Sequence, residues 1–253
     1  MSRIIFVTGT DTGVGKTLLT ASLLFYLRQS GVKAVAMKPF CSGGTADVDL
    51  IQAIQGADPA RDEVNPFYFP DPVAPLIAAR KRRQRIRLPQ VLRAIRRMEK
   101  RCECLIIEGS GGLLVPLGED FTVADVIANL ECDVVVVGKN KLGTINHTLL
   151  TVEALRARSV TRLKLVLMGQ SFSDSSARSN PGILGETLAN IRVFSLPYLG
   201  AGAASAGAVK RNVRKIKKTL ARIADPDSFR PVLRQVCDTK QRNEGTEETK
   251  KDR

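Results

Sequence analysis

Thr8-Gly9-Thr10-Asp11-Thr12-Gly13-Val14-Gly15-Lys16-Thr17 is the stretch that decides the fold of this chain. It follows the apolar run Ile4-Ile5-Phe6-Val7 and precedes a helical pattern over residues 18–27. A strand that runs into a glycine-rich loop and then a helix directs free backbone N–H groups and the positive end of the helix at one anion. A turn that merely caps the helix is the alternative, but Gly-Lys-Thr in this context favours phosphate binding.

The loop differs from the usual phosphate-binding template in its length. That template has four residues between its first glycine and the Gly-Lys pair, whereas five residues separate Gly9 from Gly15. We expect Lys16 to reach the β- and γ-phosphates of a nucleotide and Thr17 to place its hydroxyl on Mg²⁺. The extra loop residue narrows the choice of family.

Apolar strand-like runs alternate with helical patterns along the rest of the chain. Runs such as Val134-Val135-Val136-Val137 are apolar at every position, which indicates strands buried on both faces of a parallel sheet. We predict an α/β fold with a doubly wound, mostly parallel sheet and helices on both faces, of the P-loop NTPase type. The strands are expected at 3–8, 32–37, 104–108, 133–138, 163–168 and 192–196, and the helices at 16–29, 47–55, 89–101, 122–129, 145–157, 181–189 and 210–224.

The chain is predicted to hold one domain and a tail. Residues 1–237 suffice for a single α/β domain, and in it the four prolines of residues 65–75 predict an extended loop. Residues 200–208 are almost entirely Gly, Ala and Ser, which is typical of a flexible linker. A basic C-terminal helical segment is expected at 210–237. Residues 238–253 contain no large apolar residue, so we predict that they are disordered.

The formal net charge of +14 is concentrated in two segments. Residues 80–101 hold eleven Lys or Arg against one acid, and residues 210–222 hold seven and no acid. No aromatic residues are interleaved with these charges, as stacking on nucleic-acid bases would require. We interpret both segments as solvated helix faces that take no part in catalysis. Nucleic-acid contact, membrane contact and attraction of anionic substrates are the alternatives.

The remaining composition argues against several classes of protein. The five cysteines, an odd number in mostly apolar context, predict reduced thiols and not a disulfide framework. The chain starts with a core strand instead of a secretion signal, and no apolar run approaches the ~20 residues needed to cross a membrane. We therefore expect a cytoplasmic protein. His147 is the single histidine, which argues against histidine-dependent nucleophilic or zinc chemistry.

A second lysine is expected near the phosphate-binding loop. Lys38 follows the strand predicted at 32–37 and precedes Pro39. Neighbouring parallel strands end side by side, so its side chain should lie at the edge of the sheet where ligands bind. Two lysines there suit a pocket in which negative charge develops during phosphoryl transfer. A solvated lysine at a strand end is the alternative.

Three oxygen donors are predicted to bind a metal ion. Glu108 ends an otherwise apolar strand, where a carboxylate is costly to bury without a partner. Mg²⁺ is the natural partner, and it prefers hard oxygen ligands. Thr17 and Asp47 would complete the protein ligands, with Asp49 as the alternative to Asp47, whose other possible role is a helix N-cap.

Residues 141–147 predict a second anion site. They follow the strand expected at 133–138 and begin another helix. Free N–H groups at such a helix start suit a carboxylate. His147 is expected to be a structural residue of that helix.

These motifs, in this order, resemble those of the dethiobiotin synthetases, the ATP-dependent carboxylases that close the ureido ring on the way to biotin. The resemblance covers roughly residues 2–200. Met168-Gly169-Gln170-Ser171 stands where the family usually has an Asn-Asp pair near the adenine. Gln170 has the same amide groups on a longer arm, which leaves the base preference open. The matching segments are 8–17, Lys38-Pro39 with Ser42-Gly43, Asn65-Pro66-Phe67, 72–75, 108–112 with Pro116-Leu117, and 142–147.

The resemblance implies two substrates besides ATP, which are 7,8-diaminononanoate and CO₂. It also implies Mg²⁺ as the cofactor. One amine captures CO₂ as a carbamate, whose oxygen attacks the γ-phosphate. The second amine then opens the carbamic-phosphoric anhydride, closes the ring and releases phosphate. By the same resemblance, Lys38 lies beside the carbamate, Lys16 holds the phosphates, and Thr12 contacts the reacting end of the diamine.

The resemblance also implies the binding residues and a homodimer. Pro197-Tyr198-Leu199 and Gln170 would form the adenine side. The helix start at 143–146 would bind the carboxylate of the diamine, contributed by the second subunit. The implied nucleotide-binding residues are Gly13, Val14, Gly15, Lys16, Thr17, Leu18, Asp47, Glu108, Gly109, Ser110, Gly111, Gln170, Pro197, Tyr198 and Leu199. The implied substrate-binding residues are Lys38, Ser42, Gly143, Thr144 and Asn146.

Two other functions are open to this sequence. One is a P-loop ATPase of the partition or nitrogenase-iron-protein kind, or a cobyrinate amidase, on the same fold. The deviant loops of those ATPases carry an additional early lysine, where this chain has Thr10-Asp11-Thr12. The other is a non-enzymatic, ATP-gated nucleic-acid-binding protein that uses the basic segments, with the salt dependence of phosphate contacts.

Overall fold

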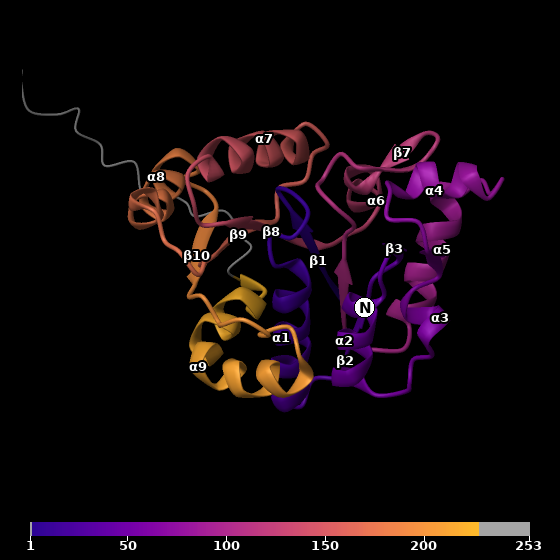
Figure 1. Cartoon of the computed structure of the whole chain (residues 1–253), viewed down its shortest axis with the longest axis horizontal. Helices are drawn as coiled ribbons and strands as arrows, with labels where there is room; N and C mark the ends of the chain where they lie inside the picture. Colours follow the sequence, from indigo (N-terminus) through magenta and orange to yellow (C-terminus); the bar gives the residue numbers. More distant parts are fainter. Residues whose placement is uncertain (1, 228–253) are drawn as a thin grey trace, which may run out of the picture.

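The computed structural model describes residues 2–227, so the predicted tail at 238–253 and the last part of the 210–237 segment lie outside the described residues (Figure 1). The strands are β1 (Arg3–Gly9), β2 (Ala34–Met37), β3 (Phe40–Ser42), β4 (Phe67–Phe69), β5 (Cys104–Glu108), β6 (Pro116–Gly118), β7 (Phe121–Thr122), β8 (Asp133–Lys139), β9 (Leu163–Met168) and β10 (Arg192–Leu196). The helices are α1 (Lys16–Gln29), α2 (Ala46–Gln55), α3 (Arg61–Val64), α4 (Pro75–Lys81), α5 (Leu88–Glu99), α6 (Val123–Ala128), α7 (Thr144–Arg156), the 3₁₀ helix η1 (Ser175–Arg178), α8 (Asn180–Thr187) and α9 (Ala206–Ala224).

The centre of the molecule is a six-stranded sheet in the order β10-β9-β8-β1-β5-β2, with every neighbouring pair parallel. Helices cover both of its faces, so the predicted doubly wound α/β fold is confirmed. A hydrophobic core lies on each face of the sheet. Alternate residues of β1 belong to one core or the other, because successive side chains of a strand point to opposite faces. Ile5 and Val7 pack with α1, α2 and α9, whereas Ile4 and Phe6 pack with α4 to α8.

The strand order differs from the chain order around β1. Strand β5 lies between β1 and β2, with Val7 opposite Glu108 and Met37 opposite Ile107. Lys38 therefore follows a strand at the edge of the sheet, and Glu108 lies between it and the loop after β1. The carboxylate is thus placed between the two predicted lysines.

The extended loop predicted at 65–75 is only partly correct. Strand β4 lies within it and pairs in parallel with β3, where the rings of Phe40 and Phe67 stack with centroids 4.8 Å apart. Pro75 is the first residue of α4, a position at which proline needs no backbone N–H and its fixed φ suits a helix. The prolines therefore mark boundaries of short elements that a reading of composition alone missed.

The flexible linker predicted at 200–208 is wrong in its last part. Helix α9 begins at Ala206, and the Ser205 side chain caps it by accepting a hydrogen bond from the Ala208 N–H. Ala203 is also buried. The small residues of this stretch allow close packing, and the helix start follows from the cap.

The basic segment at 210–222 lies entirely within α9, whose apolar side is buried against α1 and the sheet. The segment at 80–101 is not one helix face, because residues 82–87 form a turn between α4 and α5. Several of its cations pair with exposed acids, such as Arg80 with Glu119 and Arg85 with Asp120. Both segments are largely solvated, as the charge pattern predicted.

Neutralising Arg82, Arg83 and Arg85 together is expected to leave turnover nearly unchanged. Exposed charges act at long range, and salt screens that attraction over ~8 Å at physiological ionic strength. We expect only a small loss of apparent nucleotide affinity at low salt, measured by titration at two salt concentrations. A large loss of turnover at ~0.15 M salt, or tight salt-sensitive DNA binding by the unmodified protein, would contradict this interpretation.

Within residues 2–227, no helix combines the length and apolarity that spanning a bilayer demands. The cysteines at 41, 102, 104 and 132 are free within the described residues, and Cys237 lies outside them.

Candidate active site

The loop between β1 and α1 has the backbone that the sequence predicts. Gly13 and Gly15 adopt positive φ angles of 66° and 102°, a conformation that strains residues with a side chain. A β-carbon on Gly15 would also lie 3.1 Å from the side chain of Met168. Glycine at these positions therefore lets the backbone turn tightly into the start of α1.

Lys16 is buried at the base of this loop. Its Nζ donates hydrogen bonds to the carbonyl oxygens of Asp11, at 2.8 Å, and of Gly111, at 2.6 Å. Burial lowers the pKa of Lys16 to about 8, and the nearby Glu108 charge only partly opposes this effect. The ammonium thus sits between the loop and the segment after β5, where a bound phosphate would lie next to it.

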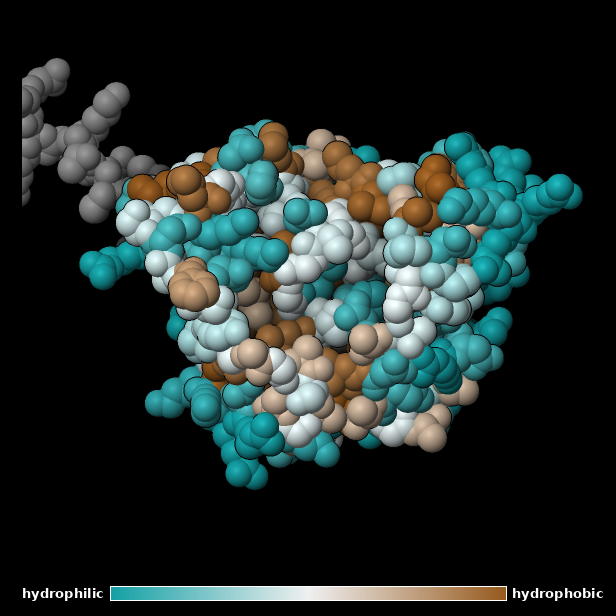
Figure 2. Space-filling view, viewed as in Figure 1, coloured by the Kyte–Doolittle hydropathy of each residue, from teal (hydrophilic) through white to brown (hydrophobic). Residues whose placement is uncertain are grey.

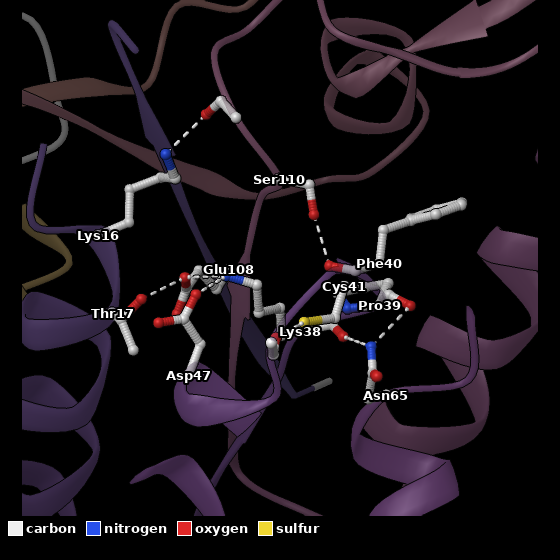
Figure 3. A network of polar contacts seen from close by, with 12 residues as sticks. Lys16, Thr17, Lys38, Pro39, Phe40, Cys41, Asp47, Asn65, Glu108 and Ser110 are labelled. Atoms are coloured by element: carbon white, nitrogen blue, oxygen red, sulfur yellow. Dashed lines mark hydrogen bonds and ion pairs between the residues drawn. The ribbon is translucent and has the colours of Figure 1, made fainter. Parts of the chain in front are cut away.

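Lys38, Asp47 and Glu108 form a compact ion-pair network with Thr17 (Figure 3). The Lys38 Nζ donates to Glu108 Oε1 at 2.7 Å and to Asp47 Oδ2. The Thr17 hydroxyl donates to the same Glu108 oxygen at 2.7 Å. Strand order explains this arrangement, because β5 places Glu108 between the phosphate-binding loop and the edge strand that carries Lys38.

The charges in this network decide its protonation. Burial alone would lower the pKa of Lys38, but the charges of Glu108 and Asp47 outweigh it and raise this pKa above its ordinary value. Burial would likewise raise the pKa of Asp47, yet the Lys38 charge holds it below its usual range. The Lys38–Asp47 pair is therefore an ammonium with a carboxylate, which gives the buried Lys38 charge the partner that it needs.

The structure separates Asp47 from its alternative, Asp49. Asp47 faces Lys38 and the pocket beside it. Asp49 accepts a hydrogen bond from the Thr45 hydroxyl at 2.8 Å and pairs with Arg61, so its carboxylate is turned to other partners. Asp47 is thus the acid that the fold places beside Glu108.

The donor set fits a Mg²⁺ ion. Glu108 is 1% exposed, and its Oε2 is buried without a hydrogen-bond partner among the described residues. A buried carboxylate oxygen in that state calls for a cation. Thr17 and Asp47 supply further hard oxygens beside it, which is the chemistry that Mg²⁺ prefers.

A pocket of about 510 Å³ joins the phosphate-binding loop to this network. Figure 2 shows it as a hollow near the middle of the viewed face, with hydrophilic side chains inside. Ten of the predicted residues line it: Thr12, Gly13, Gly15, Lys16, Thr17, Leu18, Lys38, Asp47, Glu108 and Gly111.

Other predicted residues lie outside that lining. Val14 is buried in the core, and the Ser110 hydroxyl donates to the Phe40 carbonyl (Figure 3). Gly109 packs against Phe6, and the Ser42 Oγ is buried without a partner among residues 2–227. The further residues outside it are Gln170, Pro197, Tyr198 and Leu199 after β9 and β10, and Gly143, Thr144 and Asn146 at the start of α7.

The sequence-based prediction missed one wall of the pocket. Gly200, Gly202, Ala203 and Ala204 line it, although their composition had suggested a linker. Gly200 and Gly202 have positive φ angles, so this segment is a shaped turn and not a free connection. Its place directly after the Pro197-Tyr198-Leu199 loop was the signal that could have revealed it.

Comparisons with solved structures show the fold alone. A complex of the cell division proteins MinC and MinD from Aquifex aeolicus has a TM-score of 0.53 at 11% identity, and the match covers 86% of this chain and 96% of that chain. The ParA protein of pNOB8, solved bound to nonspecific DNA, has a TM-score of 0.52 at 11% identity, and the match covers 89% of this chain and 100% of that chain.

Sequence comparisons are more specific. A family model described as an AAA domain matches residues 3–218. The ATP-dependent dethiobiotin synthetase of Anaeromyxobacter sp. is 42% identical over 71% of this chain and 82% of that protein. The Bacillus subtilis enzyme of the same name is 33% identical over 85% of this chain and 94% of that protein. The site and these relatives together place the chain in the dethiobiotin synthetase family.

Proposed function

We propose that this protein makes dethiobiotin from 7,8-diaminononanoate, CO₂ and ATP in biotin biosynthesis. The observation that carries the proposal is the Lys38–Glu108–Asp47 network, which borders the phosphate-binding loop within one pocket. The relatives at 33–42% identity support the same activity. A partition-type ATPase is not favoured, because the likeness to ParA and MinD is limited to the fold.

The reaction needs a carbamate held in line with the γ-phosphate. One amine of the diamine adds to CO₂ and loses a proton, and a carbamate oxygen then attacks the γ-phosphorus while ADP leaves. The second amine attacks the carbonyl carbon of the mixed anhydride, which expels phosphate and closes the ring. Positioning and charge neutralisation supply most of the acceleration in phosphoryl transfer.

The residues of the pocket fit distinct parts of this reaction. Lys16, between the loop and Gly111, would hold the phosphates. Lys38 would lie between the carbamate and the transferred phosphoryl group, where its ammonium stabilises the charge that develops. Thr12 lines the same pocket and would contact the reacting end of the diamine, as would Ser42. When bound, Mg²⁺ would neutralise phosphate charge, and Thr17, Asp47 and Glu108 would hold it.

A single incubation tests the proposed activity. The protein is mixed with the diamine, bicarbonate, Mg²⁺ and ATP, and mass spectrometry measures dethiobiotin. We expect product whose ureido carbon carries the label when ¹³C-bicarbonate is supplied, and none when ATP is omitted. Hydrolysis of ATP without labelled product would reject the proposal in favour of a simple ATPase.

We further propose a homodimer that completes the diamine site. The α7 start at 143–146 lies outside the pocket lining of its own chain. Leu142 and Leu150 on and beside α7 are 78% and 59% exposed, and Figure 2 shows hydrophobic residues gathered along the edge over α7. An exposed apolar patch of this kind favours a partner subunit, whose α7 start would bind the carboxylate of the diamine.

We also propose that the protein prefers ATP and that it is cytoplasmic. Gln170 donates its Nε2 hydrogen to the Met168 carbonyl at 2.7 Å, which leaves its carbonyl oxygen to accept from an exocyclic amine such as that of adenine. With Pro197-Tyr198-Leu199, it would form the base side of the ATP site.

The free thiols at 41, 102, 104 and 132 support a reducing, cytoplasmic location.

Changing Glu108 to Gln is expected to raise the Mg²⁺ concentration needed for half-maximal turnover by ~10-fold or more, because a charged metal ligand is lost. The affinity for the diamine at saturating metal should change little. Asp47→Asn should act in the same direction. Asp49→Asn is the matched control, since Asp49 is bound to Thr45 and Arg61. An unchanged Mg²⁺ titration for Glu108→Gln would return Glu108 to a structural role.

A further inference from the structure

Side chains, and not another strand, hydrogen-bond to backbone groups on the outer edge of β2. Strand β2 ends the sheet and pairs only with β5, so the backbone groups on its free edge need other partners. Gln55 of α2 fills one position: its Oε1 accepts from the Ala36 N–H at 2.9 Å, and its Nε2 donates to the Ala36 carbonyl at 3.2 Å. Buried backbone groups left unpaired would be costly.

Asn65 plays the corresponding part at the next position along the edge. It is 8% exposed, and its Nδ2 donates to the Lys38 carbonyl at 2.7 Å and to the Pro39 carbonyl at 3.4 Å. The backbone N–H of Lys38 donates to the Val64 carbonyl at 2.9 Å. The backbone of Lys38 is therefore held on both sides by the short segment that ends α3.

The next carbonyl is held from the opposite direction. The Ser110 hydroxyl, from the segment after β5, donates to the carbonyl of Phe40 (Figure 3). Three successive carbonyls, of Lys38, Pro39 and Phe40, thus accept hydrogen bonds from side chains of two other segments. Pro39 has no N–H with which to anchor this turn, so the hydrogen bonds that the carbonyls of the turn accept hold it, including one from the Phe67 N–H to the Pro39 carbonyl at 3.0 Å.

We propose that Asn65 is a positioning residue for Lys38. A lysine ammonium sits at the end of a flexible four-carbon stem, so its placement depends on where its backbone is fixed. Asn65 fixes that backbone at the point where β2 passes into β3, and it does not line the pocket itself. This inference rests on the proposed function, since it assumes that Lys38 acts on the reacting groups.

Gln55 provides a matched control on the same strand. Like Asn65, it is a buried amide, 4% exposed, that hydrogen-bonds backbone groups on the edge of β2. Its partner, Ala36, bears no functional side chain. If these amides only stabilise the edge of β2, Asn65→Ala and Gln55→Ala should lower kcat alike. If Asn65 positions Lys38, only Asn65→Ala should lower kcat.

The kinetic test compares Asn65→Ala, Asn65→Asp and Gln55→Ala after chemical unfolding has shown that each is folded. Aspartate has the shape of asparagine, but its carboxylate cannot donate to the two carbonyls. We expect kcat to fall by ~10- to 100-fold in both Asn65 variants, since a displacement of about 1 Å can cost 10²-fold. The KM for ATP should stay near the wild-type value, and Gln55→Ala should keep kcat near the wild-type value as well. Equal losses of kcat in Asn65→Ala and Gln55→Ala at equal stability would overturn the proposal.

A second measurement does not depend on turnover. In ¹⁵N-lysine-labelled protein, NMR detects the Lys38 ammonium, which Glu108 and Asp47 hold out of solvent, and Lys38→Met assigns its signal by loss. We expect this signal to shift or broaden in Asn65→Ala and to stay in place in Gln55→Ala. An unchanged signal in Asn65→Ala would refute the positioning role. A wild-type protein that makes no dethiobiotin would instead refute the proposed function and leave this result standing.

Discussion

Replacing Lys38 with methionine is expected to reduce the rate of dethiobiotin formation by roughly 10²- to 10³-fold, the usual effect of removing one group that stabilises developing charge. Methionine fills a similar volume, so packing is retained while the ammonium is lost. Mass-spectrometric initial rates at saturating ATP, diamine and Mg²⁺ measure the effect. Lys33→Met is the control, because Lys33 is exposed just before the same strand.

The same variant should also lose stability in a Mg²⁺-dependent way. Without the Lys38 ammonium, the buried Glu108 carboxylate loses its cationic partner and keeps only the Thr17 hydroxyl, and breaking a buried pair costs about 3–5 kcal/mol. Part of the lost stability should be recovered in millimolar Mg²⁺, whose charge replaces that of the ammonium. Denaturant unfolding with and without the metal measures this change in the free energy of unfolding. Wild-type turnover in Lys38→Met would remove Lys38 from the mechanism.

Replacing Lys16 with methionine is expected to abolish measurable ring closure, with a loss of ~10³-fold or more, and to weaken ATP binding. The loop backbone alone still presents N–H groups, but the cation that should lie against the β- and γ-phosphates is gone. Calorimetric titration with ATP and circular dichroism separate loss of binding from loss of folding. Lys210→Met, on the exposed side of α9, is the control.

The fold of Lys16→Met should remain intact. Lys16 is bonded only to the carbonyls of Asp11 and Gly111 among the described residues, and methionine can occupy the same space. Normal ATP affinity together with normal turnover in this variant would show that the phosphate-binding loop has no part in the reaction. An unfolded variant would contradict the structural part of this prediction.

Most of the sheet and part of the site could be predicted from local sequence. The six central strands were located because each contains a short, mostly apolar run. The phosphate-binding loop was located because a glycine-rich stretch ending in Gly-Lys-Thr follows an apolar run. The short strands β3, β4, β6 and β7 were missed, because two- or three-residue elements have no periodicity to detect. The helix at Pro75 was missed because proline is a common signal for both loops and helix starts.

By itself, the sequence determined the phosphate-binding loop, the parallel sheet and the acid at the end of β5. These depend on residue types at fixed spacing along the chain. Only the tertiary structure decided that β5 lies between β1 and β2, which brings Glu108 between Lys16 and Lys38. It also placed Asp47 against Lys38 and turned Asp49 toward Thr45, and it placed Asn65 against the Lys38 backbone. The reason is physical: interior strands are alike in their apolar composition, so their order follows from packing and from pairing of buried polar groups across the whole domain, and no local pattern records it.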